Sequence, residues 1–234
     1  MQKSAKYALI ACLAVVLLGG FAFWWFVLRS DAPERASVPV RTESTVPTDP
    51  TDPGGASSPD GTWRIAPADD VFAGYRIQEL FAGETIKNTA VGRTPAVTGT
   101  MTIVGGSVAE ASIEADLTKL ASDQSRRDSF IRGNALQTDA FPTATFRLSE
   151  PIALPSGIAV GRSVEVTAVG ELTLHGVTNR VELPLRATWN GSTISVAGGT
   201  QVILADYGID PPRLPIVTTD DVGELEVQLV FERV

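Results

Sequence analysis

Apolar and polar residues alternate with a period of two along much of the C-terminal part of the chain. The clearest stretches are residues 163–174, 180–189 and 224–232. In the last of these, leucine, valine and phenylalanine occupy the odd positions from 225 to 231. This pattern is typical of antiparallel strands with one buried face and one solvent-exposed face. The predicted solvent-exposed face of that strand carries Glu224, Glu226, Gln228 and Glu232.

Five further stretches have strand patterns and are joined by short turns. They are residues 71–79, 97–104, 107–117, 143–149 and 193–205. Asn190-Gly191 is a strong hairpin signal, and Pro184 inside a strand indicates an edge or a bulge. Eight antiparallel strands predict an all-β, up-and-down barrel that encloses at most one slender ligand. A β-sandwich has the same alternation, so the pattern leaves both architectures open.

One segment interrupts the strands. Residues 122–136 predict a short helix, with Ser122 or Asp123 as its cap and Gly133 near its end.

The N-terminal part divides into a short basic segment, an apolar segment and a linker. Residues 1–6 carry two lysines, and residues 7–28 contain no charged side chain. At about 1.5 Å per residue, such a helix spans about 30 Å of hydrocarbon. The lysines place residues 1–6 in the cytoplasm and the C-terminal domain outside it. We expect a single-pass signal anchor in the cell membrane, with cleavage to a secreted or periplasmic protein as the alternative.

Residues 29–61 are rich in proline, serine, threonine and aspartate. Such a segment buries too little apolar surface to offset the entropy of ordering it, so it predicts a flexible, disordered linker. The folded domain is then residues 62–234.

Composition excludes several functions. The net charge is −8 and the domain has no basic run, which argues against nucleic acid as a partner. The chain has one histidine, His175, and one cysteine, Cys12, which lies in the apolar segment. No metal site, catalytic residue or cofactor is therefore predicted. We expect a protein that is not an enzyme.

Two groups of residues are candidates for binding. The one basic concentration in the domain is the cluster Arg126, Arg127, Asp128 and Arg132. It is interpreted either as a contact to an anionic head group, with Arg126 and Arg127 as the candidates, or as a helix surface of paired arginines and acids. Apolar residues near them and on the inner strand faces would line a lipid tunnel or close the barrel. These residues are Phe130, Ile131, Phe141, Phe146, Val166, Leu172, Leu183, Leu185, Val227 and Leu229.

Two motifs carry a family resemblance. "SRRDSFIRGNALQTDAFPTATF" (125–146) followed by "GELTLHGVTNRVELPL" (170–185) resembles the YceI-like family of exported, lipocalin-like, polyisoprenoid-binding proteins. The second motif is the more distinctive, with Gly170, Leu172, Thr173, Gly176, Val177 and Thr178. The resemblance implies an eight-stranded lipocalin-like barrel around a long hydrophobic channel for an isoprenoid chain, such as a quinone or a polyprenyl phosphate.

The chain departs from the family pattern at two places in the domain, and the predicted membrane anchor departs from the family's usual soluble, exported form. Asp69-Asp70 stand where the family often has His-Ser, and Phe130 stands where it often has histidine. These departures favour an apolar or differently headed ligand. His175 is interpreted as an exposed or capping residue at a hairpin corner.

The apolar segment 7–28 predicts a membrane-tethered, extracytoplasmic protein, and the resemblance implies that it binds an isoprenoid or other long-chain lipid. The alternative is a non-enzymatic, stress-related or interaction module with a filled barrel.

Overall fold

The computed structural model describes residues 32–38 and 58–234. The predicted transmembrane segment 7–28 and most of the predicted linker lie outside the described residues. Within the described ranges, no helix has the length and apolar character needed to cross a bilayer. The following description concerns the unit that begins at Glu34.

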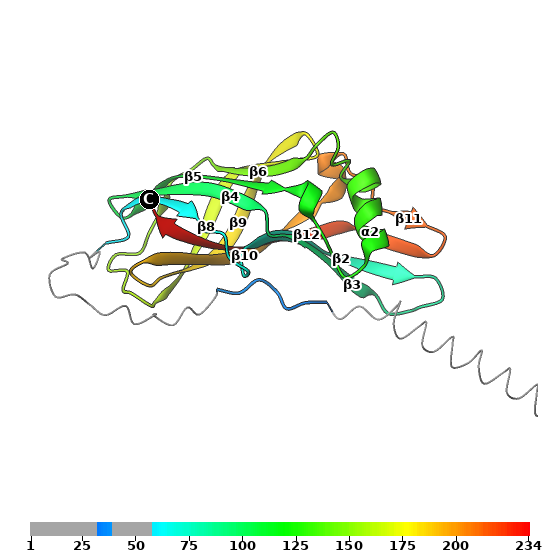
Figure 1. The fold of residues 1–234 in the computed structure, drawn as a ribbon, viewed down its shortest axis with the longest axis horizontal. Coiled ribbons are helices and arrows are strands. Elements are labelled where there is room, and N and C mark those ends of the chain that lie inside the picture. Colours follow the sequence, from blue (N-terminus) through cyan, green and yellow to red (C-terminus); the bar gives the residue numbers. More distant parts are fainter. Residues whose placement is uncertain (1–31, 39–57) are drawn as a thin grey trace, which may run out of the picture. The chain divides into compact units, whose positions relative to one another are not determined.

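The unit consists almost entirely of antiparallel strands (Figure 1). They are β1 (Gly61–Ile65), β2 (Phe72–Phe81), β3 (Asn88–Thr94), β4 (Val97–Val104), β5 (Ser107–Asp116), β6 (Thr143–Leu148), β7 (Ile152–Ala153), β8 (Ser163–Leu174), β9 (Val177–Trp189), β10 (Thr193–Ile203), β11 (Arg213–Leu214) and β12 (Val217–Arg233).

Eight of these strands close into a barrel. Their order is β1-β4-β5-β6-β8-β9-β10-β12, and β12 pairs back with β1 to complete the circle. Every pairing is antiparallel. The predicted barrel is confirmed, and the sandwich alternative is wrong.

The membership of the barrel differs in one strand from the prediction. β12 is long enough to pair with β1 at one end and with β2 at the other. The predicted strand 71–79 is β2, which extends the sheet with β3 rather than closing the barrel. The alternation rule did not find β1 or β3, because β1 is short and β3 carries Gly92 and several polar residues.

The hairpin between β8 and β9 turns at His175-Gly176. Both residues have positive φ angles, 51° and 75°, as in the two-residue turns that match the twist of antiparallel strands. The predicted hairpin is therefore confirmed. Pro184 on β9 lies just beyond the last β9–β10 pair, Leu185 with Gly198, so it occupies the edge position that its missing N–H predicts.

The predicted helix is present but shorter than 122–136. It consists of α2 (Ser125–Phe130), continued by a π-helical turn over Ile131–Ala135. Gln124 takes the cap position and makes no side-chain cap. Ser122 instead donates to Asp128 Oδ1 through its backbone N–H, at 2.9 Å, and its hydroxyl, at 2.6 Å.

The main core lies inside the barrel, and a second cluster packs against the segment that follows α2. The main core includes Trp63, Met101, Leu183 and Phe231. The second cluster is built on Leu172, Val202, Tyr207 and Ile209 and is packed by Ala135 and Leu136.

The outer face of β12 is not uniformly exposed, which corrects one expectation. Glu226 is only 2% exposed. Its Oε2 accepts from Arg76 Nε at 2.9 Å, and its Oε1 accepts from Arg93 Nε at 2.8 Å. Both arginines belong to the β2–β3 hairpin. Their charges offset the desolvation cost of burying the Glu226 carboxylate.

Part of the predicted linker lies against this face. The backbone N–H of Ala36 donates to Glu226 Oε2 at 3.2 Å, and that of Ser37 donates to Gln228 Oε1 at 3.0 Å. Arg35 forms an ion pair with Glu224. The ordered domain also begins before residue 62, since Trp63 Nε1 donates to the carbonyl of Pro59 at 2.9 Å.

Candidate functional site

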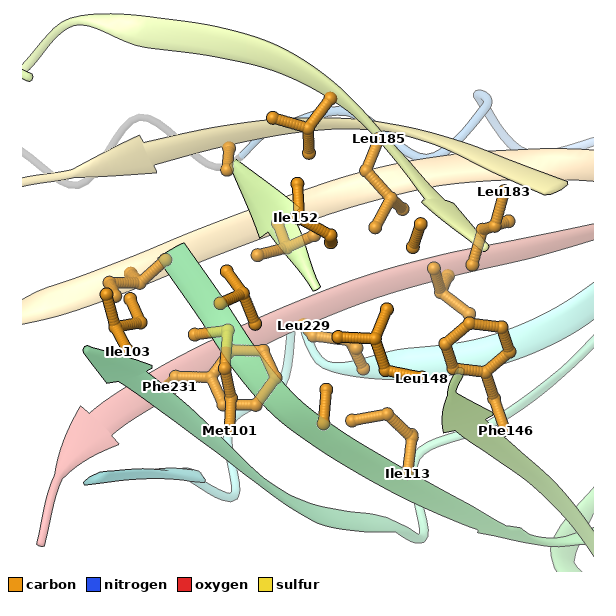
Figure 2. Close-up of a pocket in the computed structure, with 18 of the residues that line it drawn as sticks. Met101, Ile103, Ile113, Phe146, Leu148, Ile152, Leu183, Leu185, Leu229 and Phe231 are labelled. Atoms are coloured by element: carbon orange, nitrogen blue, oxygen red, sulfur yellow. The ribbon is translucent and has the colours of Figure 1, made fainter. Parts of the chain in front are cut away.

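The barrel encloses a cavity of about 160 Å³. Figure 2 shows apolar side chains converging on it from several strands, among them Met101, Ile113, Phe146, Leu183 and Leu229. Among the described residues that line it, the polar ones are Thr145, Thr200 and Arg162.

The cavity is long and narrow. The lining runs from Arg162, just before β8, to Leu172 on β8, which is about 33 Å of extended chain at about 3.3 Å per residue. With a strand tilt of about 40°, this corresponds to about 25 Å along the barrel axis. A lining of this length suits a slender chain rather than a compact ligand, and the free volume holds a short length of such a chain.

Alternation on the strands placed most of the predicted residues correctly, although they make up only part of the lining. Seven of the ten predicted lipid-contacting residues line the cavity: Phe146, Val166, Leu172, Leu183, Leu185, Val227 and Leu229. All seven lie on barrel strands, where a residue's position in the alternation fixes the face it occupies.

The other three predicted residues lie elsewhere. Phe141 packs against the His175 ring, with ring centroids 4.6 Å apart. Phe130 and Ile131 are half-buried at the end of α2 and do not line the cavity. These three residues lie outside the strands, so no alternation pattern indicates which way their side chains point.

The predicted head-group arginines also lie away from the cavity lining. Arg127 pairs with Asp123 at 2.7 Å and with Glu79 at 3.3 Å. Arg126 is exposed on α2. Burial is the main cause that raises the pKa of Glu79, with Arg127 acting in the opposite direction. Burial likewise raises the pKa of the nearby Tyr75 hydroxyl.

His175 lies at the predicted hairpin corner, and of the two predicted roles, exposed or capping, its contact with a backbone carbonyl fits the capping one. Its Nδ1 lies 3.1 Å from the carbonyl oxygen of Tyr207, and its ring is half-buried against Phe141. Its Nε2 is buried and has no hydrogen-bond partner among the described residues. His175 does not line the cavity.

Several cavity residues were not among the predicted ones. Arg162 precedes β8, and Trp189 ends β9. Ile152, Leu154 and Ile158 belong to the segment that leads to β8 and are only half-buried. Arg162 could have been found, because it is in phase with Val164 and Val166 on the inner face.

Within residues 32–38 and 58–234, no group of three or more histidine, cysteine, aspartate or glutamate side chains is placed to hold a metal ion.

Comparison with known proteins gives a family match. The YceI-like domain matches residues 63–231 of this chain. No curated protein matches the sequence significantly.

Solved structures similar to this chain have low sequence identity to it. A polyisoprenoid binding domain from Saccharophagus degradans, implicated in plant cell wall breakdown, is 16% identical, with a TM-score of 0.57; the alignment covers 74% of this chain and 98% of that one. BcnA from Burkholderia cenocepacia is 20% identical, with a TM-score of 0.49 and coverage of 67% and 95%. The Campylobacter jejuni YceI protein is 13% identical, with a TM-score of 0.44 and coverage of 64% and 91%.

Proposed function

The chain belongs to the YceI-like family, and from this membership and its enclosed cavity we propose that it holds an isoprenoid or other long-chain lipid inside the barrel. The long, narrow and almost entirely apolar cavity carries the proposal. The similar Saccharophagus degradans domain is described as polyisoprenoid binding, which is consistent with it.

The physical basis of binding is removal of the chain from water. Each buried CH₂ contributes about 0.8 kcal/mol before the cost of ordering the chain. A cavity of about 150 Å³ in another protein accepts benzene, so the free volume here suits a short length of chain. A longer chain requires lining side chains such as Met101 and Leu148 to change rotamer as it enters.

We propose a binding role rather than catalysis. The middle of the cavity presents methyl and methylene groups, which offer no general acid, base or nucleophile. The uncharged segment 7–28 supports a membrane tether, with the barrel on the extracytoplasmic side because Lys3 and Lys6 precede that segment.

Native mass spectrometry of the full chain tests the proposal. The chain is purified in detergent from bacterial membranes and released from micelles in the spectrometer. We expect an adduct whose mass and fragments identify a chain lipid. In Ala168→Phe the new ring enters the cavity from β8, and the adduct should be lost.

Thr167→Phe is the matched control, because it places the same ring on the neighbouring residue, which is exposed on the opposite face of β8. It should keep the adduct. Absence of any lipid on the wild-type chain, both as purified and after incubation with geranylgeraniol, would favour the filled-barrel interaction module instead.

A further inference from the structure

We propose that Arg162 binds an anionic head group at the mouth of the cavity, so that the ligand is a chain lipid ending in a phosphate. This inference rests on the proposed lipid-binding function and adds the chemistry and the orientation of the ligand. The head would lie beside the segment 152–162, and the chain would run toward α2.

Strand register places Arg162 at the end of the barrel interior. Ser163 pairs with Thr188 at the start of the β8–β9 ladder, and the N–H of Gly161 donates to the carbonyl of Trp189 at 2.7 Å. Arg162 therefore lies across from Trp189. It is also two residues from the inward-facing Val164, which places its side chain on the inner face.

Arg162 is the only charged residue among the described cavity lining, and it is exposed. Its aliphatic stem can cover the rim while its guanidinium reaches water, as arginine does at other apolar boundaries. No carboxylate among the described residues forms a salt bridge with it, whereas the neighbouring Arg186 pairs with Glu165 at 2.6 Å. A planar guanidinium without a carboxylate partner is suited to a phosphate.

A second donor lies at the same end. Trp189 lines the cavity, is 5% exposed and has no hydrogen-bond acceptor for its Nε1 among the described residues. Buried indole N–H groups normally have an acceptor. A phosphate oxygen held by Arg162 would supply this acceptor, because Trp189 lies across from Arg162 in the strand register.

The opposite end of the barrel disfavours an anion. Arg127 there is already paired with Glu79 and Asp123. A phosphate placed beside Arg127 would meet the two carboxylates that already pair with it. Arg126 is exposed on α2 and does not line the cavity, and Nη1 of Arg132 donates to the carbonyl of Leu120. Arg162 is the guanidinium that lines the cavity, which assigns the head group to its end and leaves the α2 end to the apolar tail.

Two ligands with the same chain separate the head group from the tail. Tritiated geranylgeranyl phosphate and geranylgeraniol are titrated onto the full chain in nanodiscs, with empty nanodiscs as background. In Arg162→Gln we expect affinity for the phosphate to fall tenfold or more, about 1.4 kcal/mol, with affinity for the alcohol unchanged. Trp189→Phe should weaken the phosphate selectively by a smaller factor.

Arg186→Gln is the matched control, since it removes an exposed arginine from the outer face of the adjacent strand and should change neither affinity. Equal losses for both ligands in Arg162→Gln, or no loss for the phosphate, would overturn the assignment while the lipid-binding function stands. If neither ligand binds the wild-type chain, the lipid-binding function itself fails, and the assignment fails with it.

Discussion

Replacing Glu226 with glutamine should destabilise the barrel far more than the position of this residue on the outer face of a strand suggests. The carboxylate is 2% exposed and both of its oxygens are used. Glutamine keeps the shape and one acceptor oxygen but removes the charge. The quantity to estimate is the loss in the free energy of unfolding when Arg76 and Arg93 no longer share a charged partner.

The structure sets the magnitude. The side chain of Arg76 is only 8% exposed, so without Glu226 its charge has little access to water. Removing one partner of a buried ion pair costs about 3–5 kcal/mol. Arg93 adds less, because its side chain is 25% exposed and its guanidinium also lies 3.9 Å from the ring centroid of Phe72. We therefore expect a loss near the low end, about 3 kcal/mol.

Urea unfolding of the full chain in detergent measures this loss. Fluorescence of the buried Trp63 and Trp189 reports on the barrel, and the midpoint shift at constant slope gives the change in the free energy of unfolding. Glu165→Gln is the control, because Glu165 pairs with Arg186 in an exposed position and should cost less than about 1 kcal/mol. Equal losses for the two variants would refute the reasoning that burial sets the cost.

Three further perturbations follow from individual contacts. Gly176→Ala should lower the free energy of unfolding by about 3 kcal/mol in the same assay, because the new Cβ would lie 2.6 Å from Phe141 Cε1 and the residue has positive φ. Gly105→Ala is the control: Gly105 also has positive φ, but a Cβ there meets open space, so the loss should be about 1 kcal/mol. Similar losses for the two variants would exclude the steric contribution of Phe141. Burial raises the pKa of Glu79, so the folded state holds this proton more tightly than the unfolded state, and stability is lost as pH rises from the ordinary glutamate value to the raised one. Glu79→Gln should remove that loss. The free energy of unfolding of the wild type and of Glu79→Gln is measured from about pH 4 to about pH 7, and the same pH dependence in both proteins would contradict this. His175→Gln should leave lipid occupancy in native mass spectra unchanged, because His175 does not line the cavity, and a lost adduct with an intact fold would show otherwise.

The local sequence pattern was sufficient to predict features that depend on a single strand or turn. Alternation in 163–174 and 180–189 identified the inner residues of β8 and β9, and the cavity is lined by them. The turn at His175-Gly176 could also be predicted, because Gly176 readily takes the positive φ that it has in the structure. These features depend on neighbours in sequence, which a single chain displays directly.

Features that depend on distant partners were not readable. Phe141 is an apolar residue in an irregular segment, and only the fold brings it to His175 instead of the cavity. Glu226 is in phase with the outer face, yet residues 150 and 133 positions away bury it. Period two assigns a face to a side chain, but it does not state what covers that face.

The sequence by itself determined that this chain forms amphipathic antiparallel strands with an apolar inner surface, because side-chain alternation is a property of each strand. Only the tertiary structure decided that β12 returns to β1, and that the circle leaves a narrow cavity whose lining includes both Arg162 and Trp189. Closure and register are pairings between residues far apart in the chain. Their free energy depends on the whole set of neighbours, which no local pattern specifies.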